Sequence, residues 1–271
     1  MFPLQLYFLQ KEDILKTILT LVLLLVASTV FATDLKYYSP GLTTQLNAHA
    51  LKNEALKIAL FETISANQTS LGYEGARKVM FGQLYIKNDS NGYYITDVYC
   101  QKRFGSNAGV KPSAIPKSDQ INCEHTWPQS KFSGSFPKDL QKADLHHLYP
   151  SDSKANSIRG NLNFVDVSND SGILSEDNCS ASKFGSSSVG SHDGFEPPLT
   201  HKGNVARSLF YFSVRYKIQI PKDEEEVLRR WNDLDPVDQE EIDHNGSIEK
   251  VQGNRNPFID FSGLANDINK F

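Results

Sequence analysis

The sequence contains few cysteines, and this scarcity excludes two ways of stabilising a fold. Only Cys100, Cys123 and Cys179 occur in 271 residues. Three cysteines allow one disulfide and leave one thiol, so the fold cannot depend on a dense disulfide framework. They also lie too far apart for a structural zinc site, which needs close cysteine or cysteine–histidine pairs. The sequence does not select which two of the three form a bridge.

Positive charge is not in excess. The chain has 28 Lys and Arg residues against 32 Asp and Glu residues, a formal net charge of -4. This balance argues against a protein that coats nucleic acid through bulk charge, because phosphate binding usually leaves a basic footprint. Any attraction to a polyanion must therefore be focused by a local patch or a bound cation. With 39% hydrophobic and 11% aromatic residues, the composition is typical of a globular chain.

Long apolar runs are also scarce, apart from residues 18–31 (ILTLVLLLVASTVF). This run is short for a membrane span, follows Lys11 and Lys16, and precedes Ala32 at a site typical of signal peptidase. We expect residues 1–32 to be a signal peptide and residues 33–271 to be one exported domain, secreted or periplasmic and without a membrane anchor. An uncleaved anchor is the alternative. Nothing in the sequence indicates an oligomeric state.

The hydrophobic patterns predict a mixed α+β fold in a single domain, with helices at both ends and strands in the middle. An Asn-Gly turn at Asn91 predicts a hairpin over 84–100. Asp235-Pro236 resembles the start of a helix, with an N-cap residue followed by proline. Predicted helices are 47–65, 73–80, 203–216 and 222–231; predicted strands are 121–127 and 162–167; 168–198 is predicted to be a long surface loop and 252–261 to be irregular.

Histidine is scarce too, yet it is concentrated in one place. Of seven histidines, His125, His146 and His147 fall within 23 residues that also contain Asp144 and directly follow Glu124. Imidazole and carboxylate together can bind a transition metal, or Mg²⁺ through mixed ligands. The segment therefore predicts a functional site. Structural roles are expected for His49, His192, His201 and His244.

Several motifs resemble the endonuclease I family, which comprises secreted and periplasmic DNA-cleaving enzymes with a ββα-metal core. The segment 122–130 (NCEHTWPQS) resembles the nuclease motif of that family. The segment 144–150 (DLHHLYP) resembles its second motif, and 156–161 (NSIRGN) the stretch that follows. Further matches lie at 206–207, 210–211, 235–237 and 252–258. The resemblance spans residues 70 to 261 and implies a central ββα-metal nuclease core flanked by helices.

The resemblance implies a role for each of three residues. His125 is expected to be the general base, and Glu124 and His147 are expected to bind one divalent cation. Mg²⁺ is the first candidate, with Mn²⁺, Ca²⁺ and Zn²⁺ as alternatives. Some family members hold the cleaved phosphate with an arginine between the two motifs. Here that segment contains Lys131, Lys138 and Lys142 instead.

Other polar residues are expected to support this centre. Arg159 either contacts phosphate or pairs with a carboxylate such as Asp144, and Lys131 is a second candidate for substrate binding. Asp144, His146, Asn156 and Asn161 are expected around the site in supporting or structural roles. Arg207, Arg215 and Lys217 are expected on a solvated helix face, and residues 252–258 are expected to form a structural clamp.

These expectations define a metal-dependent endonuclease. Its substrate is nucleic acid, DNA and alternatively RNA, and it cleaves the P–O3′ bond to leave 5′-phosphate ends. Sequence preference should be weak, because contacts to the phosphate backbone carry no sequence information. One alternative is a zinc hydrolase of peptides or esters, although the sequence lacks an HExxH motif. The other is a non-catalytic binding module with the same fold.

Overall fold

The computed structural model describes residues 36–189, 192–261 and 263–271. The predicted signal peptide lies outside the described residues. Residues Ser39–Phe271 form one compact unit, which contains all the described helices and strands. No helix within this described part combines the length and the apolar character that a bilayer crossing requires.

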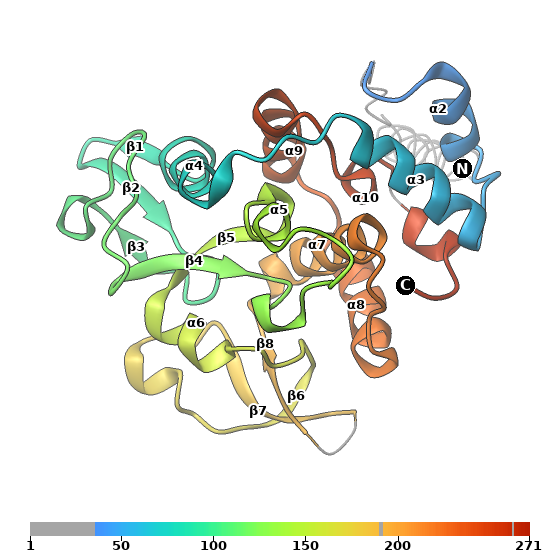
Figure 1. Ribbon diagram of the computed structural model, residues 1–271. Helices are drawn as coiled ribbons and strands as arrows, with labels where there is room; N and C mark the ends of the chain where they lie inside the picture. The colour runs from blue at the N-terminus through green and yellow to red at the C-terminus, as the bar shows by residue number, and fades with distance from the viewer. Residues whose placement is uncertain (1–35, 190–191, 262) are drawn as a thin grey trace, which may run out of the picture. The chain divides into compact units, whose positions relative to one another are not determined.

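Helices and small antiparallel sheets alternate along the chain, which confirms the predicted α+β class (Figure 1). The longer helices are α2 (Pro40–Asn47), α3 (Asn53–Ala66), α4 (Gly72–Val79), α7 (Leu199–Tyr216), α8 (Lys222–Leu234) and α9 (Gln239–Gln252). Shorter ones are α5 (Lys138–Lys142), α6 (Ser153–Arg159) and α10 (Pro257–Asp260). The strands are β1 (Lys87–Asp89), β2 (Gly92–Thr96), β3 (Arg103–Phe104), β4 (Ile121–His125), β5 (Leu148–Asp152), β6 (Val167–Asp170), β7 (Lys183–Ser187) and β8 (Asp193–Glu196).

The central element is a two-stranded antiparallel ribbon followed at once by a helix. Strands β4 and β5 pair so that Glu124 lies opposite Tyr149 and His125 opposite Leu148. Asp152 ends β5 and also caps α6, because its Oδ1 accepts hydrogen bonds from the amides of Lys154 and Ala155. This shared residue fixes the direction in which α6 leaves the ribbon.

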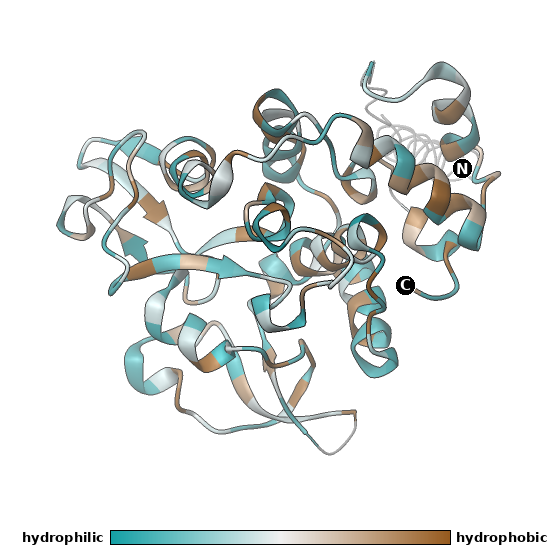
Figure 2. Cartoon of the chain, in the orientation of Figure 1, coloured by the Kyte–Doolittle hydropathy of each residue, from teal (hydrophilic) through white to brown (hydrophobic). Residues whose placement is uncertain are grey.

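Helix α7 is buried along most of its length and packs against α3, α8 and α10. Along the helices, hydrophobic residues alternate with polar ones rather than forming one continuous band (Figure 2). The prediction that Arg207 and Arg215 lie on a solvated face of this helix was wrong. Arg207 is 1% exposed and Arg215 is 5% exposed. Arg207 pairs with Glu241, and the Nε of Arg215 donates to the side-chain oxygen of Gln68, so both charges support packing between elements.

Four other predictions were wrong. The predicted strand 162–167 contains only an isolated bridge at Phe164, and β6 begins at Val167. The segment 252–261, predicted to be irregular, contains the short helix α10. The predicted loop 168–198 contains the three-stranded sheet β6-β7-β8. Its strands are short and rich in Gly and Ser, so they lack the apolar alternation by which strands are detected. The helix expected at Asp235-Pro236 begins at Gln239 instead, where Asp238 and Glu241 form a capping box.

Candidate functional site

A hollow of about 290 Å³ opens where β4 ends and α6 passes beside it. Its walls come from β4, the turn after it and α6. Strand β4 and helix α6 lie next to each other in Figure 1. The lining residues are Cys123, Glu124, His125, Pro128, Gln129, Ser130, Asn156, Arg159, Gly160 and Asn161. Because His125 is the last residue of β4, the alternation of side chains along the strand stops there, and both neighbours can reach one hollow.

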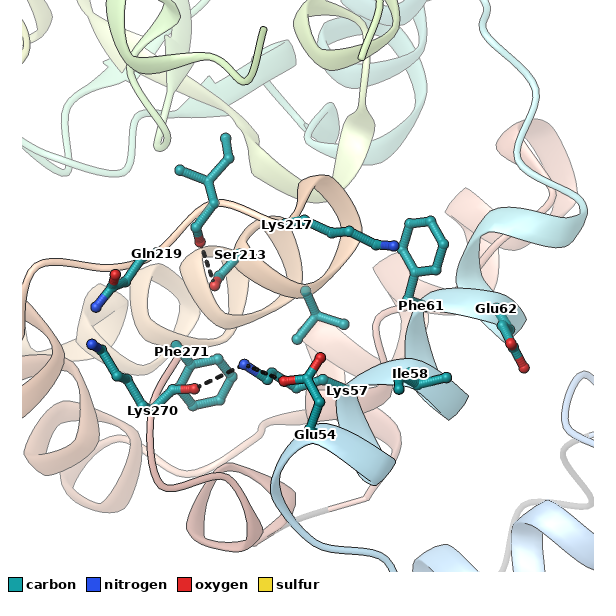
Figure 3. Close-up of a pocket in the computed structure, with 12 residues that line it drawn as sticks. Glu54, Lys57, Ile58, Phe61, Glu62, Ser213, Lys217, Gln219, Lys270 and Phe271 are labelled. Carbon is teal, nitrogen blue, oxygen red and sulfur yellow. Dashed lines mark hydrogen bonds and ion pairs between the residues drawn. The ribbon is translucent and has the colours of Figure 1, made fainter. Parts of the chain in front are cut away.

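A larger hollow of about 420 Å³ lies elsewhere, between α3, the end of α7 and the last two residues (Figure 3). Ile58, Phe61 and Phe271 give it apolar walls, and Lys217 lies over the ring of Phe61. None of the expected site residues lines it. Size therefore does not identify the functional site, whereas the convergence of polar groups does.

Glu124 is fixed by two donors that reach the same oxygen. Its Oε1 accepts a hydrogen bond from the Tyr99 hydroxyl at 2.9 Å and pairs with Nη1 of Arg159 at 2.7 Å. The residue is only 1% exposed. Burial raises the pKa of Glu124 above its ordinary value, and Arg159 and Tyr99 oppose that rise. The second oxygen, Oε2, is the atom that can bind a ligand in the hollow.

His125 is held in one tautomer by its neighbours. Its Nε2 lies 3.2 Å from the carbonyl oxygen of Lys142, which can only accept, so Nε2 carries the proton. Its Nδ1 then accepts from the side-chain amide of the exposed Gln129 at 3.3 Å. Burial and the neighbouring His147 lower the pKa of His125 to about 3. The imidazole is therefore neutral near pH 7, and its lone pair points toward Gln129, which lines the hollow.

Asn156 joins the site from α6. Its amide nitrogen donates to Oδ1 of Asn122 at 2.6 Å, which orients the amide and leaves its own Oδ1 as a possible ligand atom. Asn161, just beyond the end of α6, also lines the hollow. Only supporting roles were expected for these two residues. The helical offset between Asn156 and Arg159 was the available signal, because residues three apart share a helix face.

His147 does not line the hollow. It is fully buried, its Nε2 donates to the carbonyl of Gln141 at 2.8 Å, and its ring lies 4.4 Å from that of Phe212. The ring centroids of His147 and His125 are 5.3 Å apart, so His147 packs behind the base. Its position differs from the expectation because Leu145–His147 is a 3₁₀ turn that precedes β5 and directs the imidazole into the core.

Asp144 and His146 are buried and do not line the hollow. The buried carboxylate of Asp144 accepts from the hydroxyls of Tyr211 and Tyr216 and from the amide of Gln252. Burial alone would raise the pKa of Asp144, but His146, His147 and these hydrogen bonds hold it below its ordinary value. Nε2 of His146 donates to the carbonyl of Asn254 at 3.2 Å. Residues 252–258 thus clamp the segment that leads into β5.

The two expected substrate-binding cations are engaged elsewhere. Arg159 is 1% exposed and binds Glu124 together with the carbonyl oxygens of His125 and Thr126. It pairs with a carboxylate, as one alternative held, but with Glu124 rather than Asp144. Nζ of Lys131 donates to Asn163 at 2.7 Å, and Lys131 does not line the hollow. The sequence did not indicate the part played by Tyr99.

The donor set in the hollow fits a hard divalent cation. A carboxylate oxygen and amide oxygens are the ligands that Mg²⁺ accepts, with waters and phosphate oxygens in the other positions. No cluster of three or more His, Cys, Asp or Glu side chains that could hold a metal occurs among the described residues. Structural zinc sites usually need four such side chains, and catalytic ones three, so this set does not suit zinc.

The disulfide links Cys100 to Cys179 and leaves Cys123 as a thiol. This settles the pairing that the sequence left open. A disulfide persists in oxidising compartments, so it is consistent with export. Burial raises the pKa of Cys123 to about 12, so its thiol is not an ionised nucleophile at neutral pH.

Taken together, the fold and the site define an α+β protein in which a carboxylate and a neutral imidazole meet beside a strand–strand–helix unit. A model of the endonuclease I family matches residues 52–262, and the chain belongs to the endonuclease I family. The resemblance of the motifs is confirmed.

The relatives include proteins named as ribonucleases and proteins named as deoxyribonucleases. The chain is 35% identical over 168 residues to the extracellular ribonuclease of Bacillus subtilis (strain 168), covering 54% of this chain and 53% of the relative. It is 25% identical over 145 residues to an extracellular deoxyribonuclease of Aeromonas hydrophila, covering 52% and 59%. It is 27% identical over 163 residues to endonuclease-1 of Buchnera aphidicola subsp. Baizongia pistaciae, covering 60% of each chain. The chain thus spans about half to three fifths of the length of these relatives.

Proposed function

We propose that this protein is an exported, metal-dependent endonuclease that hydrolyses phosphodiester bonds in nucleic acid with little sequence preference. The observation that carries the proposal is the convergence of Glu124, Asn156 and a neutral His125 on one hollow. Family membership and relatives named as nucleases support it. The unit β4-β5-α6 is proposed to be the ββα-metal core, since it has that order and carries these three side chains.

His125 is proposed to be the general base. Since the carbonyl of Lys142 fixes the proton on Nε2, Nδ1 can take a proton from the attacking water. Gln129 occupies that lone pair in the structure and lies on the exposed rim, so water can replace it. An anionic phosphate in the hollow would raise the proton affinity of the imidazole and so strengthen it as a base.

Glu124 and Asn156 are proposed to hold the cation, with Asn156 in the place first assigned to His147. Arg159 and Tyr99 hold one carboxylate oxygen of Glu124 and leave the other for binding. When bound, a divalent ion such as Mg²⁺ would neutralise negative charge that develops on the phosphate and on the leaving O3′. Departure of O3′ leaves a 5′-phosphate on the other fragment.

Both DNA and RNA are proposed as substrates. A site that engages the phosphate backbone carries no requirement for one sugar. The relatives named above include a ribonuclease and a deoxyribonuclease. The zinc-hydrolase alternative is disfavoured by the ligand set, and the binding-module alternative by the oriented neutral imidazole of His125.

The test is incubation of residues 33–271 with supercoiled plasmid and with RNA, each with Mg²⁺ and with EDTA. We expect nicking and RNA degradation with Mg²⁺ and neither with EDTA. His125→Ala should keep the wild-type circular dichroism spectrum and lose at least about 100-fold in rate, the usual contribution of a general base. Near-normal nicking by His125→Ala would remove it as the base. Absence of any cleavage by the wild type would reject the function.

A further inference from the structure

Two cations lie over one aromatic ring beside the hollow. The guanidinium carbon of Arg77, on α4, is 4.6 Å from the centroid of the Tyr73 ring. Nζ of Lys142, at the end of α5, is 4.3 Å from the same centroid. The ring of Tyr73 lies 5.4 Å from the imidazole of His125. Both cations therefore contact an aromatic ring that lies next to the proposed base.

Within the described part of the chain, no carboxylate forms an ion pair with Arg77 or Lys142, and Nε of Arg77 is buried without a hydrogen-bond partner. Other cations nearby are engaged: Lys78 pairs with Glu74, and Arg159 pairs with Glu124. In a chain with a net charge of -4, two adjacent unpaired cations are a focused positive region.

Their position relative to the hollow follows from His125. Its imidazole lines the hollow and lies 5.4 Å from the Tyr73 ring, over which both cations lie. The main-chain carbonyl of Lys142 also orients His125, so Lys142 both positions the proposed base and carries one of the two positive charges.

A purely structural role explains these contacts poorly. An exposed cation–π contact contributes only about 0.5–1 kcal/mol, and placing two like charges on one ring opposes that gain. The arrangement becomes favourable when an anion is shared between the two cations. Arginine and lysine both bind phosphate, arginine as a planar fork and lysine as a point charge.

We propose that Arg77 and Lys142, held together by the Tyr73 ring, form a subsite for a backbone phosphate that flanks the scissile phosphate on the His125 side of the hollow. The proposal rests on the proposed function for its substrate class. It assigns to these two residues the anchoring of the polyanion, a role expected for Lys131 or Arg159 from the sequence. Tyr73 acts as a positioning residue that keeps the two cations in place.

The test measures binding of a fluorescein-labelled 12-nucleotide single-stranded DNA by anisotropy between 50 and 200 mM salt, with Mg²⁺, in the inactive His125→Ala background. Removal of one cation that binds a phosphate should reduce the slope of log K against log salt by about 0.7 for a single strand. Arg77→Gln and Lys142→Gln should each show this reduction and weaken binding about fivefold at low salt. Lys78→Gln on α4 and Lys138→Gln on α5 are the matched controls and should retain the parent slope.

Tyr73 supplies an independent arm. Tyr73→Phe keeps the ring and should retain the parent slope, whereas Tyr73→Leu should reduce it. Thermal unfolding of each variant identifies any variant that fails to fold. If Arg77→Gln does not fold, Lys142→Gln alone tests the subsite, because Lys142 lies at a partly exposed helix end. Unchanged slopes for Arg77→Gln and Lys142→Gln would overturn the subsite. The wild-type cleavage assay tests the proposed function separately. If the wild type nicks plasmid but the salt slopes of the variants are unchanged, the function is retained and only the phosphate subsite is rejected.

Discussion

At the scale of single residues, each group in the site has one atom fixed by the protein and one left for chemistry. Oε1 of Glu124 is bound by Tyr99 and Arg159, and Nε2 of His125 is bound by the Lys142 carbonyl. The amide nitrogen of Asn156 is bound by Asn122. The remaining atoms are Oε2, Oδ1 and Nδ1, and Nδ1 contacts the side chain of the exposed Gln129. This division orients the site before any ligand binds, which is how preorganised sites gain their efficiency.

Asn156 and His147 are the two candidates for the second ligand of the cation, and their substitutions should have different effects. Asn156→Ala should raise the Mg²⁺ concentration for half-maximal plasmid nicking by at least about tenfold, in line with losses seen on removing groups that support metal sites. His147→Gln should lower the unfolding free energy, because it disturbs a fully buried ring, yet leave the Mg²⁺ requirement near that of the wild type. Titration of the nicking rate with Mg²⁺ distinguishes them. The reverse result would restore His147 as the ligand.

The sequence was most informative for residues that are adjacent in it. Glu124 and His125 could be identified because a short motif holds both. Asn156 was harder, since its place in the site depends on how Asp152 turns the chain from β5 into α6. Tyr99 reaches Glu124 from 25 residues away, and no local pattern predicts such a contact.

At the scale of elements, the disulfide connects the β6-β7-β8 region to the site through Tyr99. Cys100 is bonded to Cys179, and the hydroxyl of Ser182 donates to the carbonyl of Tyr99 at 2.7 Å. The Tyr99 ring packs 4.6 Å from Phe195 of β8, and its hydroxyl reaches Glu124. The region predicted to be a plain loop therefore supports one wall of the site.

Removing this bridge should weaken both the fold and the site. The two cysteines are 79 residues apart, for which loop-closure entropy gives about 4.5 kcal/mol. The double variant Cys100→Ser/Cys179→Ser should lose about 2–5 kcal/mol of unfolding free energy in urea and also need more Mg²⁺ for nicking. Cys123→Ser removes a thiol without a bridge and should lose far less stability. Equal losses in the two proteins would refute a special role for the bridge.

Elements whose apolar spacing is strong were predicted from the sequence. Helices α3, α4, α7 and α8 lie close to their predicted ranges, and β4 lies inside its predicted strand. The sheet β6-β7-β8 was missed because its short strands lack apolar alternation, and its order depends on pairing between strands. Gly185 shows this, since a Cβ there would lie 2.0 Å from the carbonyl oxygen of Asn169. Such close approach is a property of the assembled sheet rather than of its sequence pattern.

At the scale of the whole molecule, several histidines are buried in their neutral form, and this makes stability depend on pH. Burial and Arg207 lower the pKa of His201 to about 3. Burial lowers the pKa of His147 to about 4. The unfolded chain takes up protons at these sites below about pH 6.5, whereas the folded chain does not. Their stabilising effect is therefore complete above pH 6.5 and is lost as the pH falls toward 3 or 4.

His201 offers the clearest measurement, because it lies outside the hollow and its Nε2 has no hydrogen-bond partner among the described residues. Buried carboxyls with raised pKa values, such as Glu224 and Glu241, oppose the trend, so the informative quantity is a difference between proteins. Between pH 5.5 and 4, the unfolding free energy of wild type should fall more steeply than that of His201→Gln by about 1.4 kcal/mol per pH unit, the value for one proton. Urea unfolding at several pH values measures both slopes.

If His201→Gln keeps the wild-type slope, the His201 imidazole must bind its proton equally in both states. A buried ring between Tyr99 and Tyr149, with no partner for Nε2 in the described part of the chain, should not do so. A reduced slope for His201→Gln alone would establish that burial of neutral imidazole, rather than net charge, sets the acid limit of this fold.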